Sequence, residues 1–100
     1  MLEYCLNLIC HPAVHEKLLD VLLDSDDVEV FTSAQIHSHG MTKARLSAQE
    51  QVMGRSRSIH IQALLNAEAL SNLLGRIQLE FASSEIRYWT SPVIAAGEFK

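Results

Sequence analysis

The segment from residue 35 to residue 60 constrains this chain more than any other part of its sequence. It joins two stretches with strand-like alternation, yet a hairpin between two such strands needs only about two to five residues. Connections of this length in compact domains are usually functional or disordered. Between His37 and His60 the segment carries four basic residues and one acid, a net charge of +3, while the whole chain has a net charge of −4. A basic segment on an acidic protein favours contact with an acidic partner surface or a small anion.

The middle of this segment has the sequence of a short helix. Ser47 and Glu50 have the S-x-x-E spacing of a capping box, and Gly54 stands where a short helix would end. We expect one or two helical turns over residues 47–53, and Gly40 marks the exit from the preceding strand. The residues expected to contact an effector or a partner protein are Gly40, Lys43, Arg45, Glu50, Gly54, Arg55 and Arg57. The alternative is a solvated loop with incidental charge.

The composition is that of one domain, expected over residues 1–100. The chain has 100 residues, and its 48% hydrophobic content is enough for a packed core, without a change in composition that would mark a linker. No apolar run reaches the ~20 residues of a membrane span and no signal peptide is recognisable, so we expect a cytoplasmic protein without membrane insertion. Cys5 and Cys10 lie too far apart on one expected strand for a disulfide, so both should be free thiols. The pI of about 5.6 disfavours nucleic acid as a partner.

Apolar periodicity predicts four strands and two helices. Strands are expected at residues 3–10, 28–36, 58–65 and 85–91, with helices after His11-Pro12 and after Asn66. Right-handed crossovers applied to this order put the first and third strands in the middle of the sheet and both helices on one face. The predicted fold is therefore an α+β, ferredoxin-like βαββαβ sandwich, with a four-stranded antiparallel sheet and a long loop between the second and third strands.

The sheet face without helices is expected to be partly apolar. Strand alternation assigns to it the side chains of Cys5, Ile9, Phe31, Leu64 and Trp89. An exposed apolar patch usually marks an interface, and a symmetric homo-oligomer would cover this one. We expect Phe31, Leu64 and Trp89 in that interface.

Several side chains that can ligate metals fall at one end of the predicted sheet. The end of the first strand, the start of the first helix and the base of the long loop meet there. The candidate ligands for a divalent metal or copper are Cys10, His11, His15, His37 and His39. The alternative is that they are ordinary core, helix-start and surface residues, because the spacing typical of metal motifs is missing. No local motif pairs a nucleophile with a base, so we do not expect an enzyme.

With this order of elements the chain resembles the PII-like family of trimeric signalling proteins. The resemblance covers nearly the whole length and includes a long loop after Ile36-His37-Ser38-His39-Gly40 and a C-terminal Gly97-Glu98 pair. The chain is most similar to a small PII-like group associated with heavy-metal efflux. The resemblance implies a homotrimer whose long loop engages a partner protein, often a membrane transporter or an enzyme, with effectors bound in clefts between subunits.

The chain departs from the nucleotide-binding members of that family at three places. The turn between the second helix and the fourth strand, residues 81–85, has no glycine or lysine to cradle phosphates. Ala95 and Ala96 stand where the family has arginines, and Met41 follows Gly40 where an effector-binding glutamine is expected. We therefore expect adenine nucleotides such as ATP to bind weakly or not at all.

Two functions are consistent with these features. The first is a PII-like regulatory protein that modulates a partner, such as a metal-efflux transporter or a nitrogen-related target, through its long loop. The alternative is a cytoplasmic metal-binding protein of a heavy-metal resistance system that has no signalling partner.

Overall fold

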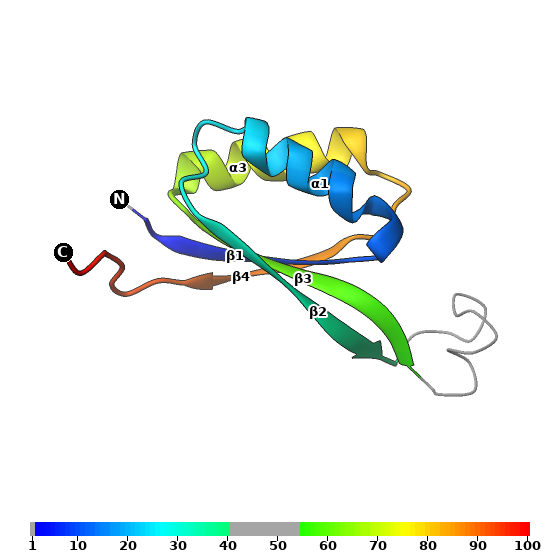
Figure 1. Ribbon diagram of the computed structural model, residues 1–100. Coiled ribbons are helices and arrows are strands. Elements are labelled where there is room, and N and C mark those ends of the chain that lie inside the picture. Colours follow the sequence, from blue (N-terminus) through cyan, green and yellow to red (C-terminus); the bar gives the residue numbers. More distant parts are fainter. Residues whose placement is uncertain (1, 41–54) are drawn as a thin grey trace.

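The computed structural model describes residues 2–40 and 55–100, which form a four-stranded sheet with two helices on one face (Figure 1). The elements are β1 (Tyr4–Cys10), α1 (Pro12–Asp24), β2 (Phe31–His39), β3 (Arg55–Leu65), α3 (Ala67–Glu80) and β4 (Arg87–Pro92). The strand order is β2-β3-β1-β4, and all three neighbouring pairs are antiparallel. The predicted ferredoxin-like fold, with the first and third strands in the middle, is confirmed.

Local chemistry sets where the two helices begin and end. α1 starts at Pro12, whose missing N–H costs no hydrogen bond in the first turn. At the other end of α1 the Ser25 hydroxyl donates to the Val21 carbonyl at 2.7 Å. α3 starts after Asn66, whose side-chain oxygen accepts a hydrogen bond from the Ala69 N–H at 2.8 Å. Because α1 follows the end of β1 and α3 precedes the start of β4, which pairs with the end of β1, the start of α1 and the end of α3 lie at the same end of the sheet (Figure 1).

The core lies between the helices and one face of the sheet. Alternate residues of the central strands are almost completely buried there, namely Leu6, Leu8, Cys10, Ile59, Ile61, Ala63 and Leu65. The helices contribute Leu18, Val21, Leu22, Ala69, Leu73 and Ile77. Burial of one large aliphatic side chain contributes about 1.5–3 kcal/mol relative to leaving it exposed, so this layer holds the helices on the sheet.

Phe31 lies on the opposite face of the sheet from the one expected. It pairs with the core residue Ala63, and directly paired residues share a face. Its side chain is accordingly half-buried against the core. The prediction that Phe31 shares the helix-free face with Leu64 and Trp89 is therefore wrong, although those two residues do lie on that face. The strand carries apolar residues on both faces, so its alternation did not decide which face turns toward the helices.

The start of β2 also differs from the prediction. The Val28 N–H donates to the Ser25 carbonyl at 3.1 Å, so residues 28–30 belong to the connection after α1 and pairing begins at Phe31. β2 then continues to His39. Gly40 follows with a φ of +82°, which glycine adopts without strain, and this agrees with its expected place at the strand exit.

The starts of β3 and β4 also differ from the prediction by a few residues. β3 begins at Arg55, directly opposite His39, and not at residue 58, while β4 begins at Arg87 and not at residue 85. The expected helix over residues 47–53 lies outside the described residues. The same holds for Lys43, Arg45, Glu50 and Gly54.

Candidate functional site

Two neighbouring cavities open at the end of the sheet where five elements meet. The last residues of β1 and β2, the first residues of β3 and β4 and the start of α1 all lie at this end (Figure 1). The strand-end cavity has a volume of about 420 Å³, and its polar lining includes Cys10, His11, Ser38, His39, Glu85 and Arg87. The helix-side cavity has a volume of about 700 Å³ and is lined in part by His11, Gln35, His37 and Arg57. Residues 41–54 connect β2 to β3 at this same end.

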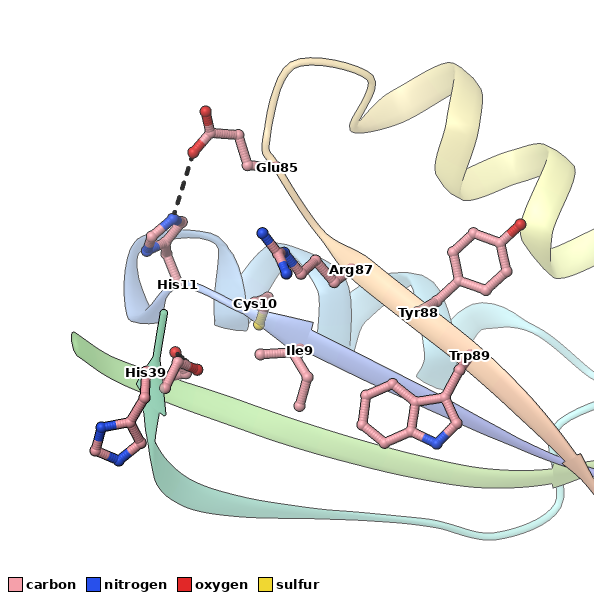
Figure 2. Close-up of a pocket in the computed structure, with 10 residues that line it drawn as sticks. Ile9, Cys10, His11, His39, Glu85, Arg87, Tyr88 and Trp89 are labelled. Atoms are coloured by element: carbon pink, nitrogen blue, oxygen red, sulfur yellow. Dashed lines mark hydrogen bonds and ion pairs between the residues drawn. The ribbon is translucent and has the colours of Figure 1, made fainter. Parts of the chain in front are cut away.

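The strand-end cavity has a lining of mixed charge. Figure 2 shows His11, Glu85 and Arg87 around one part of it. His11 Nε2 lies 3.7 Å from Glu85 Oε2, so the start of α1 forms an ion pair with the turn before β4 when His11 is protonated. The hydroxyl oxygens of Ser38 and Ser58 are 2.7 Å apart and share a hydrogen bond in the wall of the cavity. The guanidinium and hydroxyl groups suit an oxyanion, and the Glu85 carboxylate opposes one.

Glu85 itself adopts a backbone conformation that favours glycine. Its φ is +57°, and it is the one non-glycine residue with a positive φ in the described part of the chain. The conformation costs roughly 1–2 kcal/mol for a residue with a Cβ atom. Glu85 follows a turn in which the Ser84 N–H donates to the Phe81 carbonyl at 3.0 Å. The turn before β4 therefore uses a left-handed residue without having a glycine.

The helix-side cavity has a lining of different character. The residues of the described chain that line it include Arg57, His37, His11 and Gln35 but no carboxylate. His37 pairs with Arg57, and Gln35 pairs with the core residue Ile59, so these side chains lie on the helix-covered side of β2 and β3. α1 begins beside them, and its cap residue His11 makes no side-chain capping bond. The guanidinium and the start of a helix both favour an anion, so this cavity suits a small anionic ligand.

The helix-free face carries a polar cluster that no local sequence pattern indicates. Asn7, in the middle of β1, is only 4% exposed. Its Oδ1 accepts hydrogen bonds from His60 Nε2 at 2.9 Å and from Gln62 Nε2 at 3.1 Å, and the Trp89 ring stacks on His60 at a centroid distance of 5.7 Å. The partners of Asn7 are 53 or more positions away along the chain. Only the alternation of β1, which assigns Asn7 to this face, was visible in the sequence.

The five candidate metal ligands do not form one site. Cys10, His11 and His39 line the strand-end cavity, His37 lines the other cavity, and His15 lines neither. Figure 2 shows the rings of His11 and His39 pointing in opposite directions. Within residues 2–40 and 55–100, no group of three or more His, Cys, Asp or Glu side chains is placed to hold a metal ion. Burial raises the pKa of the Cys10 thiol to about 11, so without a bound cation this thiol is protonated at neutral pH.

The residues expected to form contacts with other molecules have separate locations. Arg57 lines the helix-side cavity, and Gly40 follows β2 at the same end of the sheet. Trp89 is 50% exposed and Leu64 is half-buried, both on the helix-free face. Neither helix of the described residues is both long enough and apolar enough to cross a membrane.

The fold defined above is the fold of PII-like proteins. CPII from Thiomonas intermedia K12, a nitrogen regulatory PII-like protein bound to ADP, AMP and bicarbonate, matches with a TM-score of 0.74 and 18% identity, over 99% of this chain and 98% of that chain. A GlnK–ATP complex from B. subtilis matches with a TM-score of 0.61 and 15% identity, over 92% of this chain and 82% of that chain. At such low identities these similarities show the fold alone.

The sequence identifies the family more narrowly. The profile of a family described as protein of unknown function, DUF3240, matches residues 2–100, and the chain belongs to this family. A crystal structure of a DUF3240 family protein from Shewanella baltica OS155 has a TM-score of 0.82 and 18% identity, and the match covers 100% of this chain and 99% of that chain. A search among curated proteins finds no match.

Proposed function

We propose that this protein is a PII-like regulatory protein that binds a small anionic effector at the strand ends and signals to a partner protein through residues 41–54. The observation that supports this best is the position of both cavities at the end of the sheet where that segment leaves β2 and returns to β3. A ligand in either cavity would contact residues such as His39 or Arg57, which lie within a few positions of the segment. Binding would then change the surroundings of the segment, which is a regulatory role and not a catalytic one.

The proposed effector is an oxyanion, either free or carried by an adenine nucleotide. Arg57 and Arg87 each supply a guanidinium, a group that binds phosphate and carboxylate oxygens with two parallel hydrogen bonds. Two proteins of the same fold support this class of ligand, since CPII was solved with ADP, AMP and bicarbonate and GlnK with ATP. Adenine nucleotides therefore deserve testing, although the turn before β4 lacks glycine and lysine. The expectation that ATP binds weakly stays a prediction.

We also propose that the protein assembles as a homotrimer of single PII-like domains that span residues 1–100. Leu64 and Trp89 lie on the helix-free face, and an aromatic side chain that is half exposed there would gain from burial against a second copy. Phe31 is not part of this proposed interface, because it packs against the core.

The proposed partner is a protein with an acidic surface, such as a metal-efflux transporter or a nitrogen-related target. The net charge of +3 between His37 and His60 on an otherwise acidic chain supports this choice. Deletion of residues 41–53 should abolish recovery of the partner in a pull-down, and recovery by the intact protein should fall as the salt concentration rises. Equal recovery by both forms would remove the segment from the mechanism.

Calorimetric titration with AMP, ADP, ATP and bicarbonate tests the effector. Arg57→Ala should weaken binding of a ligand in the helix-side cavity, and Arg87→Ala should weaken binding of a ligand in the strand-end cavity. Each loss should be about tenfold to a hundredfold, because a charge-assisted hydrogen bond is lost. Arg76→Ala is the matched control, since Arg76 pairs with Glu80 and Asp24 on the helices. An absence of binding for all four ligands, or an equal loss in the control, would contradict the proposal.

A further inference from the structure

Glu85 lines the strand-end cavity, and its backbone has a conformation that residues with a Cβ atom rarely adopt. Its φ of +57° favours glycine or asparagine, yet the residue present is a β-carbon-bearing acid. Residues held in such sparsely populated conformations cluster at functional sites, where the surrounding structure keeps them in place. The rare backbone conformation of Glu85 therefore points to a functional role for its side chain.

The carboxylate has a defined position relative to the basic groups of the cavity. Its Oε2 lies 3.7 Å from His11 Nε2, and both residues line the cavity together with Arg87 (Figure 2). The side chains of His11 and Glu85 are 33% and 44% exposed, so their mutual attraction contributes little to stability. The charge of Glu85 nevertheless acts on any ligand that enters the cavity, because the carboxylate stands in its lining.

The charged side chains of the strand-end cavity favour ligands that carry fewer negative charges. Arg87 supplies one positive charge for the first carbonate or phosphate group of a ligand, whereas each further phosphate adds negative charge to a cavity that already contains Glu85. The helix-side cavity, which lacks a carboxylate in its described lining, does not impose this limit. We infer that Glu85 is a specificity-determining residue that makes the strand-end cavity select a small oxyanion or a nucleoside monophosphate over a triphosphate. This inference rests on the proposed function, since it specifies the charge of the effector.

The experiment compares wild type, Glu85→Gln and Glu29→Gln in calorimetric titrations with AMP, ADP and ATP at constant ionic strength. Glu29 is an exposed acid before β2, at the other end of the sheet, so its substitution removes the same charge without touching the cavity. Removal of the Glu85 charge should strengthen ATP binding by about tenfold and AMP binding by no more than about threefold, because ATP carries roughly two more negative charges. Glu29→Gln should change neither.

Glu85→Gly separates the effect of charge from the effect of the backbone. Glycine accepts the positive φ, so this variant should melt at a higher temperature than Glu85→Gln while showing the same gain in ATP affinity. A gain in ATP affinity that appears only in Glu85→Gly would assign the selectivity to the backbone and overturn the inference.

The remaining outcomes separate this inference from the proposed function. Equal gains for AMP and ATP in Glu85→Gln, or no gain for either, would overturn the selective role of Glu85 while leaving effector binding in place. If only Glu85→Gln binds ATP and wild type binds no nucleotide, the inference stands and adenine nucleotides are removed from the proposed function. If neither protein binds any of the three nucleotides, the selective role of Glu85 is contradicted, and the proposed function is contradicted as well when bicarbonate does not bind either.

Discussion

The two faces of the sheet are made from alternate residues of the same strands, yet they bury their side chains by different means. On the helix-covered face Leu6 and Leu8 are fully buried by the two helices. On the other face Asn7, which lies between them in β1, is almost as well buried although neither helix of the described residues covers it. Its burial comes from neighbouring side chains of the sheet, with hydrogen bonds to His60 and Gln62.

This contrast shows that burial in this protein has two sources with different consequences. The apolar face contributes to stability in proportion to its buried area, and it would keep this role in a monomer. The polar cluster contributes little net free energy while intact, but its members depend on one another, because an unpaired buried polar group is costly. Leu64 and Trp89 lie on the same face and remain partly exposed.

Substitution in the helix-covered face should have the largest effect. Leu8→Ala should lower the free energy of unfolding by about 2–5 kcal/mol, because it removes a fully buried side chain and leaves a cavity. Urea denaturation followed by circular dichroism measures the change. Leu79→Ala, at a position that is 87% exposed, should stay within about 0.5 kcal/mol of wild type. A small effect of Leu8→Ala would show that the covered face is loosely packed.

Substitution in the polar cluster should have the next largest effect. Asn7→Ala should lower the free energy of unfolding by about 1–3 kcal/mol, because His60 and Gln62 lose the acceptor that they share. The control is Thr32→Ala, an exposed position of β2 on the same face, opposite Gln62. If the two variants are equally stable, the cluster is not a structural element of this face.

The two cysteines of β1 report on the two faces separately. Burial raises the pKa of Cys10 from 9.0 to about 11, so as the pH rises the thiol of the unfolded chain ionises before that of the folded chain. The free energy of unfolding should therefore fall by about 1.4 kcal/mol per pH unit between these two pKa values. Below that interval this thiol should cause no change. Native protein at pH 8, diluted below the concentration at which it assembles, leaves the helix-free face open, so iodoacetamide followed by mass spectrometry should find Cys5 modified and Cys10 protected. Denatured protein, in which both thiols react, is the control. Equal rates in native protein would contradict the difference between the faces.

The smallest effect on the folded chain is expected at Trp89. Trp89→Ala should lower the free energy of unfolding by about 0.5–1.5 kcal/mol, because it removes a half-exposed ring and its stack on His60. Its effect on assembly should be larger. Analytical ultracentrifugation should show that wild type is a trimer and that the variant dissociates at a higher protein concentration than wild type does. A wild-type monomer at micromolar concentration would contradict the proposed interface.

The elements that the sequence predicted well depend on short-range signals. Pro12 and Asn66 mark helix starts through contacts within one turn, and the alternation of Leu6, Leu8 and Cys10 identified the buried face of β1. β2 was predicted less well, because its apolar residues occur on both faces and its pairing with β3 decided which of them faces the helices. That pairing explains why Phe31 packs against the core and does not lie in the expected interface.

The sequence predicted which ends of the elements meet, but not the full lining of the two cavities there. The expected topology correctly brought the ends of β1 and β2 and the start of α1 together, and His11, His37 and His39 do line the two cavities there. The left-handed conformation of Glu85 and its approach to His11 were not predictable. The two residues are far apart in the chain, and they meet because His11 follows β1 and Glu85 precedes β4, which pairs with β1.

By itself, the sequence determined the order of strands and helices, the side of β1 that is buried, and the basic character of the segment between β2 and β3, because each depends on residues within a few positions of one another. Only the tertiary structure decided the face of Phe31, the acceptor role of Asn7 and the position of Glu85 in the strand-end cavity. Each of these depends on strand register or on a contact between distant segments. A register shift of one residue would turn every side chain of a strand to the other face, so local patterns in β2 could not determine the face of Phe31.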